Sequence, residues 1–381
     1  MRKILYIGGF ELPDKNAAAH RVVNNAKIFT DLGYETIFLN VFRNDESQIM
    51  KLDQHKVYNI KYPRKFIDWY TYLCSIKDII EIYSNNKEID MIVAYNYPSV
   101  ALFKLFLFCK KNNVKLVSDC TEWYSNTSEN LIWNTIKELD TSLRMSFINK
   151  KLDGIIVISE LLEKHYKNNK TILIPPLIDI KDEKWSLKKE EYKDDDRSVK
   201  LVYAGNPQKS KERLDTIIET LFEIKNYNFK FNIIGINKKD YLTLYPEHKS
   251  IINELNSKLL FLGRVDHEIA LNIIKASDFS IFLRDSSKMV NAGFPTKFVE
   301  SSTLGIPSIT TNISDLSKYL IDGFNGFFVE IDDKEKLKSK MKNIFELERK
   351  EINQIKLNLD INLYFYYKSF VKNMDVFIRS L

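Results

Sequence analysis

Short apolar runs rich in β-branched residues alternate along the chain with longer segments whose apolar residues recur at helical spacing. Five runs lie in the first half and five in the second: KILYIGG, ETIFLNVF, DMIVAYN, VKLVSD and DGIIVIS, then VKLVYAGN, FKFNIIG, KLLFLG, FSIFLR and IPSITT. This alternation is typical of βαβ units and parallel sheets. Because KILYIGG and VKLVYAGN both lead through glycine into a polar loop, we predict two Rossmann-like, doubly wound α/β domains with ligands at their carboxyl-end loops.

The boundary between the domains is predicted from a charged stretch with little apolar periodicity, DIKDEKWSLKKEEYKDDDRS. We expect a first domain over 1–180, a linker over 181–199 and a second domain over 200–361. Apolar residues recur at helical spacing again in NLYFYYKSFVKNMDVFI, so a helix over about 362–381 should pack back on the first domain. A length of 381 residues suits two hydrophobic cores.

Composition narrows the class of protein. Hydrophobic residues make up 44% of the chain and charged residues 28%, which is ordinary for a globular protein. A net charge of +6 at this length gives no argument for a nucleic-acid partner. The chain has no apolar run long enough for a transmembrane helix, and its start does not fit a signal peptide. Three cysteines without metal or disulfide spacing favour a reducing compartment, and we predict a cytoplasmic location.

The stretch VNAGFPTKFVESSTLGIPSI predicts a helix that starts at Pro295 and stops at Gly305. Free backbone N–H groups, the helix dipole and Lys297 in the first turn predict an anion site at its amino end. Glu300 follows one turn later, where a carboxylate can accept hydrogen bonds from a vicinal diol such as ribose. A solvated glutamate on a helix face is the alternative, and the local pattern does not choose between the two.

The order of motifs in the second half resembles the donor-binding half of glycosyltransferase family 4, the retaining enzymes of GT-B fold. The segment FLGRVDHEIALNIIKASDFSIFLRDSSKMVNAGFPTKFVESSTLGIPSITTNISDLSKYLIDGFNGFF contains the family's Leu-Gly-x-Val, Gly-Phe, Gly-x-Pro-x-Ile and Asp-Gly-x-Asn-Gly motifs in the family's order. The resemblance is strongest over 201–329 and looser before it. It implies transfer of a sugar from a UDP- or GDP-sugar to an acceptor hydroxyl with retention, without a metal ion or any other cofactor.

The resemblance also implies roles for individual residues. Glu300 would hold the donor ribose, and Lys211 would be the cation beside the phosphates. The start of the helix would face the diphosphate, and the loop after KLLFLG would lie by the nucleobase. The implied donor-binding residues are Gly205, Asn206, Gly263, Arg264, Gly293, Phe294, Pro295, Thr296, Lys297 and Glu300.

Two positions depart from the family pattern. Ala292 stands where the family's first glutamate usually contacts the donor sugar, and Asn206 stands where a phosphate-binding arginine is usual. Recognition of the sugar and stabilisation of the leaving group must therefore differ. The residues that can substitute are Lys209, Arg284, Lys288 and Asn291, and the sequence does not choose among them.

The first half has weaker similarities. Ala17 and Ala18 stand where the family often has two glycines, so this loop, with His20 beside it, is predicted to approach a phosphate or the acceptor. Ordinary helix-forming alanines and a surface histidine are the alternative. In VSDCTEWYSN a strand leads to Asp119, Glu122 and Trp123, which we predict to face the cleft between the domains. Asp119 and Glu122 are candidate catalytic groups, with a structural role as the alternative.

Two further segments invite a chemical interpretation. Asp194, Asp195 and Asp196 match an Asp-x-Asp metal motif, but they lie in the charged linker and not at the end of an apolar strand, so we predict no metal site there.

Between Lys51 and Lys77, six aromatic residues are interspersed with lysine and arginine. This surface could rest on an anionic membrane, at whose inner face a glycan or lipid-linked acceptor would be found. An ordinary surface loop and helix is the alternative.

Three functions remain open from sequence. The first is the transferase, in polysaccharide or other glycoconjugate biosynthesis. The second is a sugar-nucleotide epimerase of the same two-domain fold, which would need acid–base carboxylates and histidines around the sugar, and the chain has only five histidines. The third is a partner subunit that binds a nucleotide sugar without turnover, a reading that the departures at Ala292 and Asn206 allow.

Overall fold

The structure is a computed structural model that describes residues 2–13, 15–42, 49–52, 54–123, 131–185, 198–207, 211–359 and 362–381. The chain divides into two compact units. The first comprises Met1–Asp179, Ala292–Phe294 and Phe365–Leu381, and the second comprises Ile180–Asn291 and Pro295–Tyr364. The Asp194–Asp196 motif and Lys209 lie outside the described residues.

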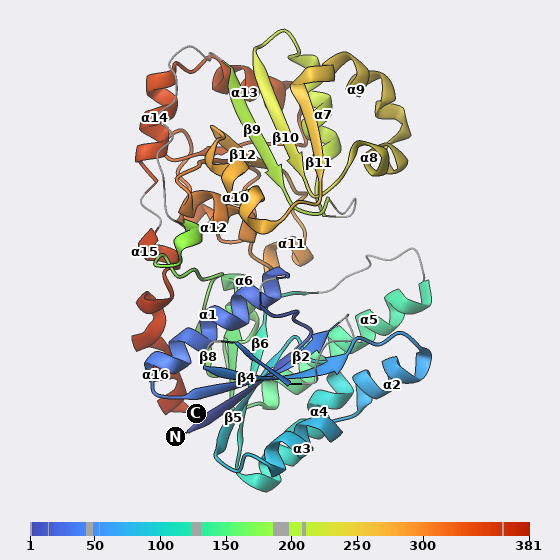
Figure 1. Ribbon diagram of the computed structural model, residues 1–381, viewed down its shortest axis with the longest axis vertical. Coiled ribbons are helices and arrows are strands. Elements are labelled where there is room, and N and C mark those ends of the chain that lie inside the picture. Colours follow the sequence, from blue (N-terminus) through green and yellow to red (C-terminus); the bar gives the residue numbers. More distant parts are fainter. Residues whose placement is uncertain are drawn as a thin grey trace. The chain divides into compact units, whose positions relative to one another are not determined.

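Within the described residues, the first unit contains an eight-stranded sheet in the order β3-β4-β2-β1-β5-β6-β7-β8 (Figure 1). Its strands are β1 (Lys3–Gly8), β2 (Glu35–Phe42), β3 (Ile49–Leu52), β4 (His55–Lys61), β5 (Ile89–Tyr95), β6 (Lys115–Cys120), β7 (Gly154–Val157) and β8 (Thr171–Leu173). Neighbouring strands are parallel except β3 and β4, which are antiparallel. The parallel strands bring the ends of β1, β5 and β6 to one edge of the sheet.

Helices cover both faces of this sheet. They are α1 (Ala17–Asp31), α2 (Phe66–Cys74), α3 (Lys77–Ser84), α4 (Ser99–Asn112), α5 (Leu131–Leu143), α6 (Glu160–His165) and α16 (Val371–Ser380), with shorter helical segments η1 (Arg144–Ile148), η2 (Asn149–Lys151) and η7 (Tyr367–Phe370). One core cluster joins the sheet to α3 and α4 through residues such as Ile82 and Leu105. The other joins it to α1 and α16.

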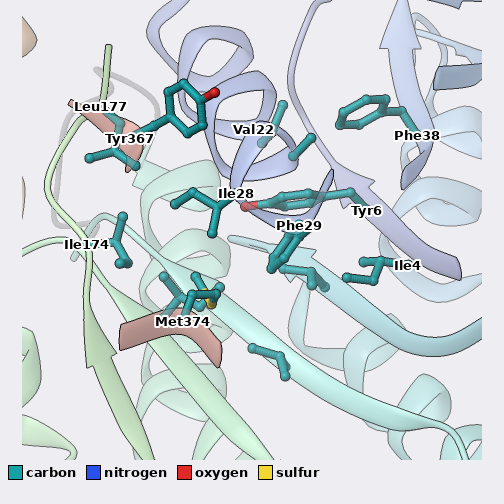
Figure 2. Close-up of a cluster of buried hydrophobic side chains, with 14 of the residues drawn as sticks. Ile4, Tyr6, Val22, Ile28, Phe29, Phe38, Ile174, Leu177, Tyr367 and Met374 are labelled. Atoms are coloured by element: carbon teal, nitrogen blue, oxygen red, sulfur yellow. The ribbon is translucent and has the colours of Figure 1, made fainter. Parts of the chain in front are cut away.

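Figure 2 shows this second cluster, in which Phe29 of α1 packs beside Tyr6 and Ile4 of β1. The Tyr6 ring stacks on the Phe38 ring with centroids 6.2 Å apart. Met374 of α16 and Tyr367 of η7 complete the cluster, so the carboxyl-terminal residues belong to the first unit.

Within the described residues, the second unit contains a six-stranded sheet in the order β11-β10-β9-β12-β13-β14, with every neighbouring pair parallel. Its strands are β9 (Val199–Ala204), β10 (Phe229–Ile234), β11 (Leu259–Gly263), β12 (Phe279–Phe282), β13 (Ser308–Thr310) and β14 (Phe327–Phe328). Helices in this part of the chain are α7 (Leu214–Glu223), α8 (Lys238–Leu244), α9 (Lys249–Leu255), α10 (His267–Lys275), α11 (Lys288–Ala292), α12 (Thr296–Thr303), α13 (Lys334–Phe345), α14 (Arg349–Leu357) and α15 (Asn362–Phe365), with short segments η3 (Glu183–Trp185), η4 (Pro246–His248), η5 (Asn256–Lys258) and η6 (Leu316–Lys318).

Each of the ten apolar runs in the sequence forms a strand of one of these sheets. Four strands were not expected: β3, β4, β8 and β14. Three of them are two to four residues long, and β4 lies in the basic and aromatic segment that suggested a surface loop and helix. None of the helices in the described ranges is long and apolar enough to cross a membrane.

Candidate functional site

Three glycine loops meet at the carboxyl end of the second sheet. Gly205 follows β9 and Gly235 follows β10, both with positive φ angles, 144° and 107°. A Cβ atom on Gly235 would lie 2.0 Å from the carbonyl oxygen of Gly205, so a larger residue cannot replace it. The Gly235 N–H donates to the Gly263 carbonyl oxygen at 2.7 Å. The structure therefore brings the predicted residues Gly205 and Gly263 together.

Helix α12 begins at Thr296, directly after Pro295, and ends at Thr303. Phe298, Val299 and Ser301 are among its buried residues. Among the residues that the structure describes, no side chain caps its amino end, where the first backbone N–H groups lack partners within the helix. Lys297 and Glu300 are three residues apart and therefore lie on one face.

Lys297 extends from α12 to the loop after β9. Its Nζ lies 3.1 Å from Oε2 of Glu212 and 3.9 Å from the ring centroid of Tyr203, with 13% of the side chain exposed. A Cβ atom on Gly205 would lie only 2.6 Å from Cε of Lys297. The lysine is thus pressed against the glycine loop. Burial lowers its pKa to about 8, and the charges of Arg284 and Lys211 act in the same direction against Glu212.

The partner of Lys297, Glu212, is buried and binds a second cation. Nε and Nη2 of Arg284 donate to Oε1 of Glu212 at 2.9 and 2.5 Å. Burial opposes ionisation of Glu212, yet Lys297 and Arg284 together hold the pKa of its carboxyl below the usual value. One carboxylate therefore faces two cations, and the cluster has an excess of positive charge. We call Glu212, Arg284 and Lys297 the second-unit cluster.

Glu300 is half-buried on the same helix face as Lys297. Desolvation raises the pKa of its carboxyl to about 7, although Lys184 and Lys297 act in the opposite direction. A carboxyl group in these surroundings gains by accepting hydrogen bonds from a ligand's hydroxyls.

The other residues that were predicted to bind the donor lie outside the second-unit cluster. Lys211 is half-buried and within electrostatic reach of Lys297, whereas Asn206 and Arg264 are exposed. Gly293 and Phe294, predicted in the donor domain, have their contacts in the first unit together with Ala292. The Phe294 ring packs on Phe365 with centroids 5.9 Å apart. The predicted domain over 200–361 includes them, and the packing of the Phe294 ring accounts for their contacts with the first unit.

The residues that were predicted to replace the family's glutamate and arginine differ in their surroundings. Arg284 belongs to the second-unit cluster. Asn291 accepts a hydrogen bond from Ser314 N at 2.9 Å and donates to Ser286 Oγ at 3.0 Å, which ties two loops together. Lys288 is exposed. Of the described candidates, Arg284 stands beside the predicted phosphate residues.

A cavity of about 660 Å³ lies at the carboxyl ends of β12, β13 and β14. Thr311, Asp322, Lys336 and Lys340 line it together with Arg284. Several of its charges are already paired, such as Lys340 with Asp322 at 2.8 Å. Arg284 is the residue that this cavity shares with the second-unit cluster.

In the first unit, Asp119 at the end of β6 is fully buried. Nε and Nη2 of Arg21 donate to its Oδ1 at 2.9 and 2.8 Å, and the hydroxyl of Tyr6 donates to its Oδ2. Asn25 completes the set with a longer hydrogen bond of 3.4 Å to Oδ2. The prediction that Asp119 is a catalytic group facing a cleft does not fit this geometry, because its lone pairs are occupied inside the protein. We call Asp119, Arg21, Tyr6 and Asn25 the first-unit cluster.

The remaining candidates of the first unit are more accessible. Glu122 and Trp123 are half-buried, and the Trp123 ring lies 4.8 Å from that of His165. Ala17 is exposed, and Ala18 and His20 are half-buried, all in the first turn of α1. Asn16 caps this helix by accepting a hydrogen bond from Ala19 N at 2.8 Å. The alanines therefore lie in the first turn of a capped helix, and their predicted approach to a phosphate or the acceptor stays a prediction.

Known proteins resemble this chain in sequence and in structure. Residues 184–358 match the family model "Glycosyl transferases group 1". An uncharacterized glycosyltransferase of Methanocaldococcus jannaschii is 23% identical over 306 residues, which are 68% of this chain and 75% of the relative. Sucrose-phosphate synthase from Thermosynechococcus elongatus has a TM-score of 0.75 at 12% identity, covering 100% of this chain and 98% of that one. Anabaena HepE, solved in complex with UDP-glucose, has a TM-score of 0.67 at 15% identity, covering 100% of both chains.

The structural likeness confirms the predicted GT-B fold of two Rossmann-like domains. The match over 184–358 includes β9 to α14 and the whole second-unit cluster. It confirms the predicted class of enzyme, a glycosyltransferase.

Proposed function

We propose that the chain is a retaining glycosyltransferase of family 4 that moves a sugar from a UDP- or GDP-sugar to an acceptor hydroxyl in glycoconjugate or polysaccharide assembly. The observation that carries the proposal is the second-unit cluster, with its excess positive charge against the Gly205 loop and one helical turn from Glu300. Anabaena HepE, of the same fold, is solved with UDP-glucose, which supports a nucleotide-sugar donor here.

The diphosphate would lie against the Gly205 loop and the amino end of α12. Negative charge grows on the diphosphate as it departs, and fixed donors aimed at that charge stabilise the transition state. Lys297 supplies the cation, Lys211 adds a second positive charge within reach, and Glu212 holds Lys297 in place. Because these cations meet the charge of the diphosphate, we propose that transfer needs no divalent ion.

The donor ribose would bind Glu300. Its carboxyl is half-buried and lies on the same face of α12 as Lys297. Burial removes water from the carboxyl group and raises its pKa to about 7. Two hydroxyls of a ribose would donate to the two carboxylate oxygens and replace the lost hydration. We therefore assign Glu300 a role in binding and none in bond breaking.

In the transfer step, the acceptor oxygen forms a bond to the anomeric carbon on the face that the phosphate leaves. The bond between that carbon and the phosphate oxygen breaks, its electron pair stays on the phosphate, and the hydroxyl proton passes to the same phosphate oxygen. Asp119 cannot serve as a base for this step because Arg21 and Tyr6 occupy its carboxylate. The acceptor-binding role of Glu122, Ala17, Ala18 and His20 remains a prediction.

Incubation with a panel of UDP- and GDP-sugars, with and without EDTA, tests the proposal. We expect slow release of a nucleoside diphosphate from one donor by hydrolysis, unchanged by EDTA and reduced at least tenfold in Lys297→Met. An altered sugar without release would support the epimerase. Binding of a nucleotide sugar with neither product would support the partner subunit.

A further inference from the structure

Helix α4 of the first unit exposes an apolar stripe. Val100, Phe103 and Leu107 are all exposed and follow one another at helical spacing, while Leu102 and Leu105 on the other side face the core. A helix that buries one face against a sheet normally presents polar residues on the other. The second apolar face of α4 is therefore available for a contact outside the unit.

Two neighbouring helical elements have the same property. On α5 and its continuation η1, Ile136, Leu139, Leu143 and Phe147 are exposed at intervals of three, four and four residues. Leu139 is 65% exposed and Phe147 is 61% exposed. The stripe thus runs unbroken over about three helical turns.

Helix α2 adds an aromatic end to this surface. Phe66 is 82% exposed, and Ile67 and Tyr70 are also exposed, on the first turns of the helix. Trp69 lies among them, with its ring 5.8 Å from that of Tyr62. Aromatic residues of this kind are enriched where protein meets the boundary between lipid and water.

The three elements are neighbours in the first unit, because α4 contacts both α2 and α5. Nζ of Lys104 on α4 donates to the carbonyl of Cys74 at the end of α2 at 2.7 Å. The backbone N–H of Ser99 at the start of α4 donates to Asp140 of α5 at 2.7 Å. In Figure 1, α2, α4 and α5 lie on the same side of this sheet. The three apolar stripes therefore lie on neighbouring helices on one side of the sheet.

Basic side chains are interspersed with these stripes. The exposed basic residues on or next to the three elements are Lys61, Arg64, Lys65, Lys77, Lys104, Lys110, Lys111, Lys137, Lys150 and Lys151. Acidic residues there are fewer: Asp68, Asp78, Glu81, Glu138 and Asp140. Asp68 and Asp140 already accept backbone hydrogen bonds, so their charge is partly used within the unit.

We propose that this surface, made by α2, α4 and α5–η1, docks on an anionic lipid bilayer. Apolar stripes on short helices enter the interface between headgroups and acyl chains, and lysines with long stems reach back to phosphate groups. A protein partner would favour a continuous apolar centre with few lysines, whereas here Lys104 follows Phe103 on α4, Lys137 follows Ile136 on α5, and Lys65 directly precedes α2. The inference extends the expected membrane contact from 51–77 to α4 and α5, and it does not depend on the proposed transfer chemistry.

The test is sedimentation of the full chain with vesicles of phosphatidylcholine alone and with 30% phosphatidylglycerol added. The triple variant Phe66→Ser, Phe103→Ser, Leu139→Ser should bind anionic vesicles at least tenfold more weakly than the parent. Leu357→Ser, Val376→Ser is the matched control, since these positions are 73% and 63% exposed on α14 and α16, and it should bind as the parent does. Thermal midpoints of all three proteins should agree, because every altered side chain is exposed.

Salt and oligomeric state complete the test. Binding should weaken at 0.5 M salt, since screening reduces attraction between lysines and anionic headgroups. Equal binding to both vesicle types, or no binding, would overturn the proposal. A dimer of the parent that the triple variant breaks, without vesicle binding, would show instead that the surface joins two copies of this chain.

Discussion

Two buried clusters of similar composition stand at the carboxyl ends of the two sheets, and they differ in how their charges balance. Each contains a carboxylate, an arginine and a neighbouring tyrosine. In the first-unit cluster, Asp119 faces one cation, Arg21, whose Nη1 also donates to the Ile174 carbonyl oxygen at 2.9 Å. In the second-unit cluster, Glu212 faces two cations.

This difference separates a structural role from a binding role. The first-unit cluster is neutral and its carboxylate is saturated, so a ligand would have to break internal bonds to use it. The second-unit cluster has a surplus charge on a lysine whose pKa is lowered to about 8, and it lies against a loop where only glycine fits. An anion relieves that surplus, which is the physical reason for assigning the diphosphate to the second cluster.

The largest expected effect is on stability. Glu212→Gln and Asp119→Asn each remove the charge that compensates a buried arginine. Breaking a buried ion pair by removing one partner costs about 3–5 kcal/mol. Unfolding in urea measures the loss. A change below about 1 kcal/mol in either variant would show that its cluster is hydrated, because the remaining cation would then need no partner.

The second prediction compares one cation of each cluster, by its effect on donor use and on stability. Lys297→Met should lower kcat/KM for the donor by about 10²–10³, the usual effect of removing a group that stabilises developing charge. Its stability should stay close to that of the parent, since desolvation already disfavours the charged lysine. Arg21→Met should do the reverse, with lost stability and a retained KM for the donor in the folded fraction. If Arg21→Met abolishes donor binding in folded protein, the assignment of roles is wrong.

Substitution of Glu300 tests whether this residue binds the donor ribose. Glu300→Gln should weaken donor binding about tenfold to a hundredfold, since hydrogen bonds to a charged group contribute about 1.5–3 kcal/mol. The parent should also discriminate against a 2′-deoxy donor, and the variant should lose that discrimination. Calorimetry with both nucleotides in both proteins measures the coupling. Additive effects of the two changes would contradict a contact between Glu300 and the ribose.

The smallest effect is a narrow pH optimum. Glu300 accepts hydrogen bonds best when ionised, so kcat/KM should rise as pH increases through about 7. Lys297 is charged below its pKa, so kcat/KM should fall as pH increases through about 8. Glu300→Gln should remove the acidic limb, and Lys297→Arg should move the basic limb upward because arginine stays charged. A profile that is flat from pH 6 to 9 would count against both assignments.

The sequence predicted the parts of the molecule that depend on local pattern. The ten strands follow from apolar runs, and α12 spans Thr296–Thr303 between the proline and glycine that marked it. Lys297 and Glu300 share a face because three residues separate them. Strand β4 was missed because its few apolar residues stand between Lys56 and Lys61 in a basic and aromatic segment, which we interpreted through its charge.

Contacts between distant residues could not be predicted. Glu212 pairs with Arg284, 72 residues away, and nothing in the run KERLD marks it as buried. Asp119 ends a strand as a catalytic carboxylate might, but Arg21 of α1, 98 residues earlier, occupies it. The same local pattern therefore suits a structural and a catalytic carboxylate, and the partner that decides between them comes from elsewhere in the chain.

The most direct measurement is the dissociation constant for UDP and GDP, by calorimetry at pH 7, of the parent, Lys297→Met and Lys225→Met. Lys225 is a matched surface lysine of the second unit, paired with Glu254 at 2.6 Å. We predict that the parent binds one of the two nucleotides, that Lys297→Met binds it at least tenfold more weakly, and that Lys225→Met binds it as the parent does. Equal affinity in the parent and Lys297→Met would contradict the assignment of the diphosphate to the second-unit cluster.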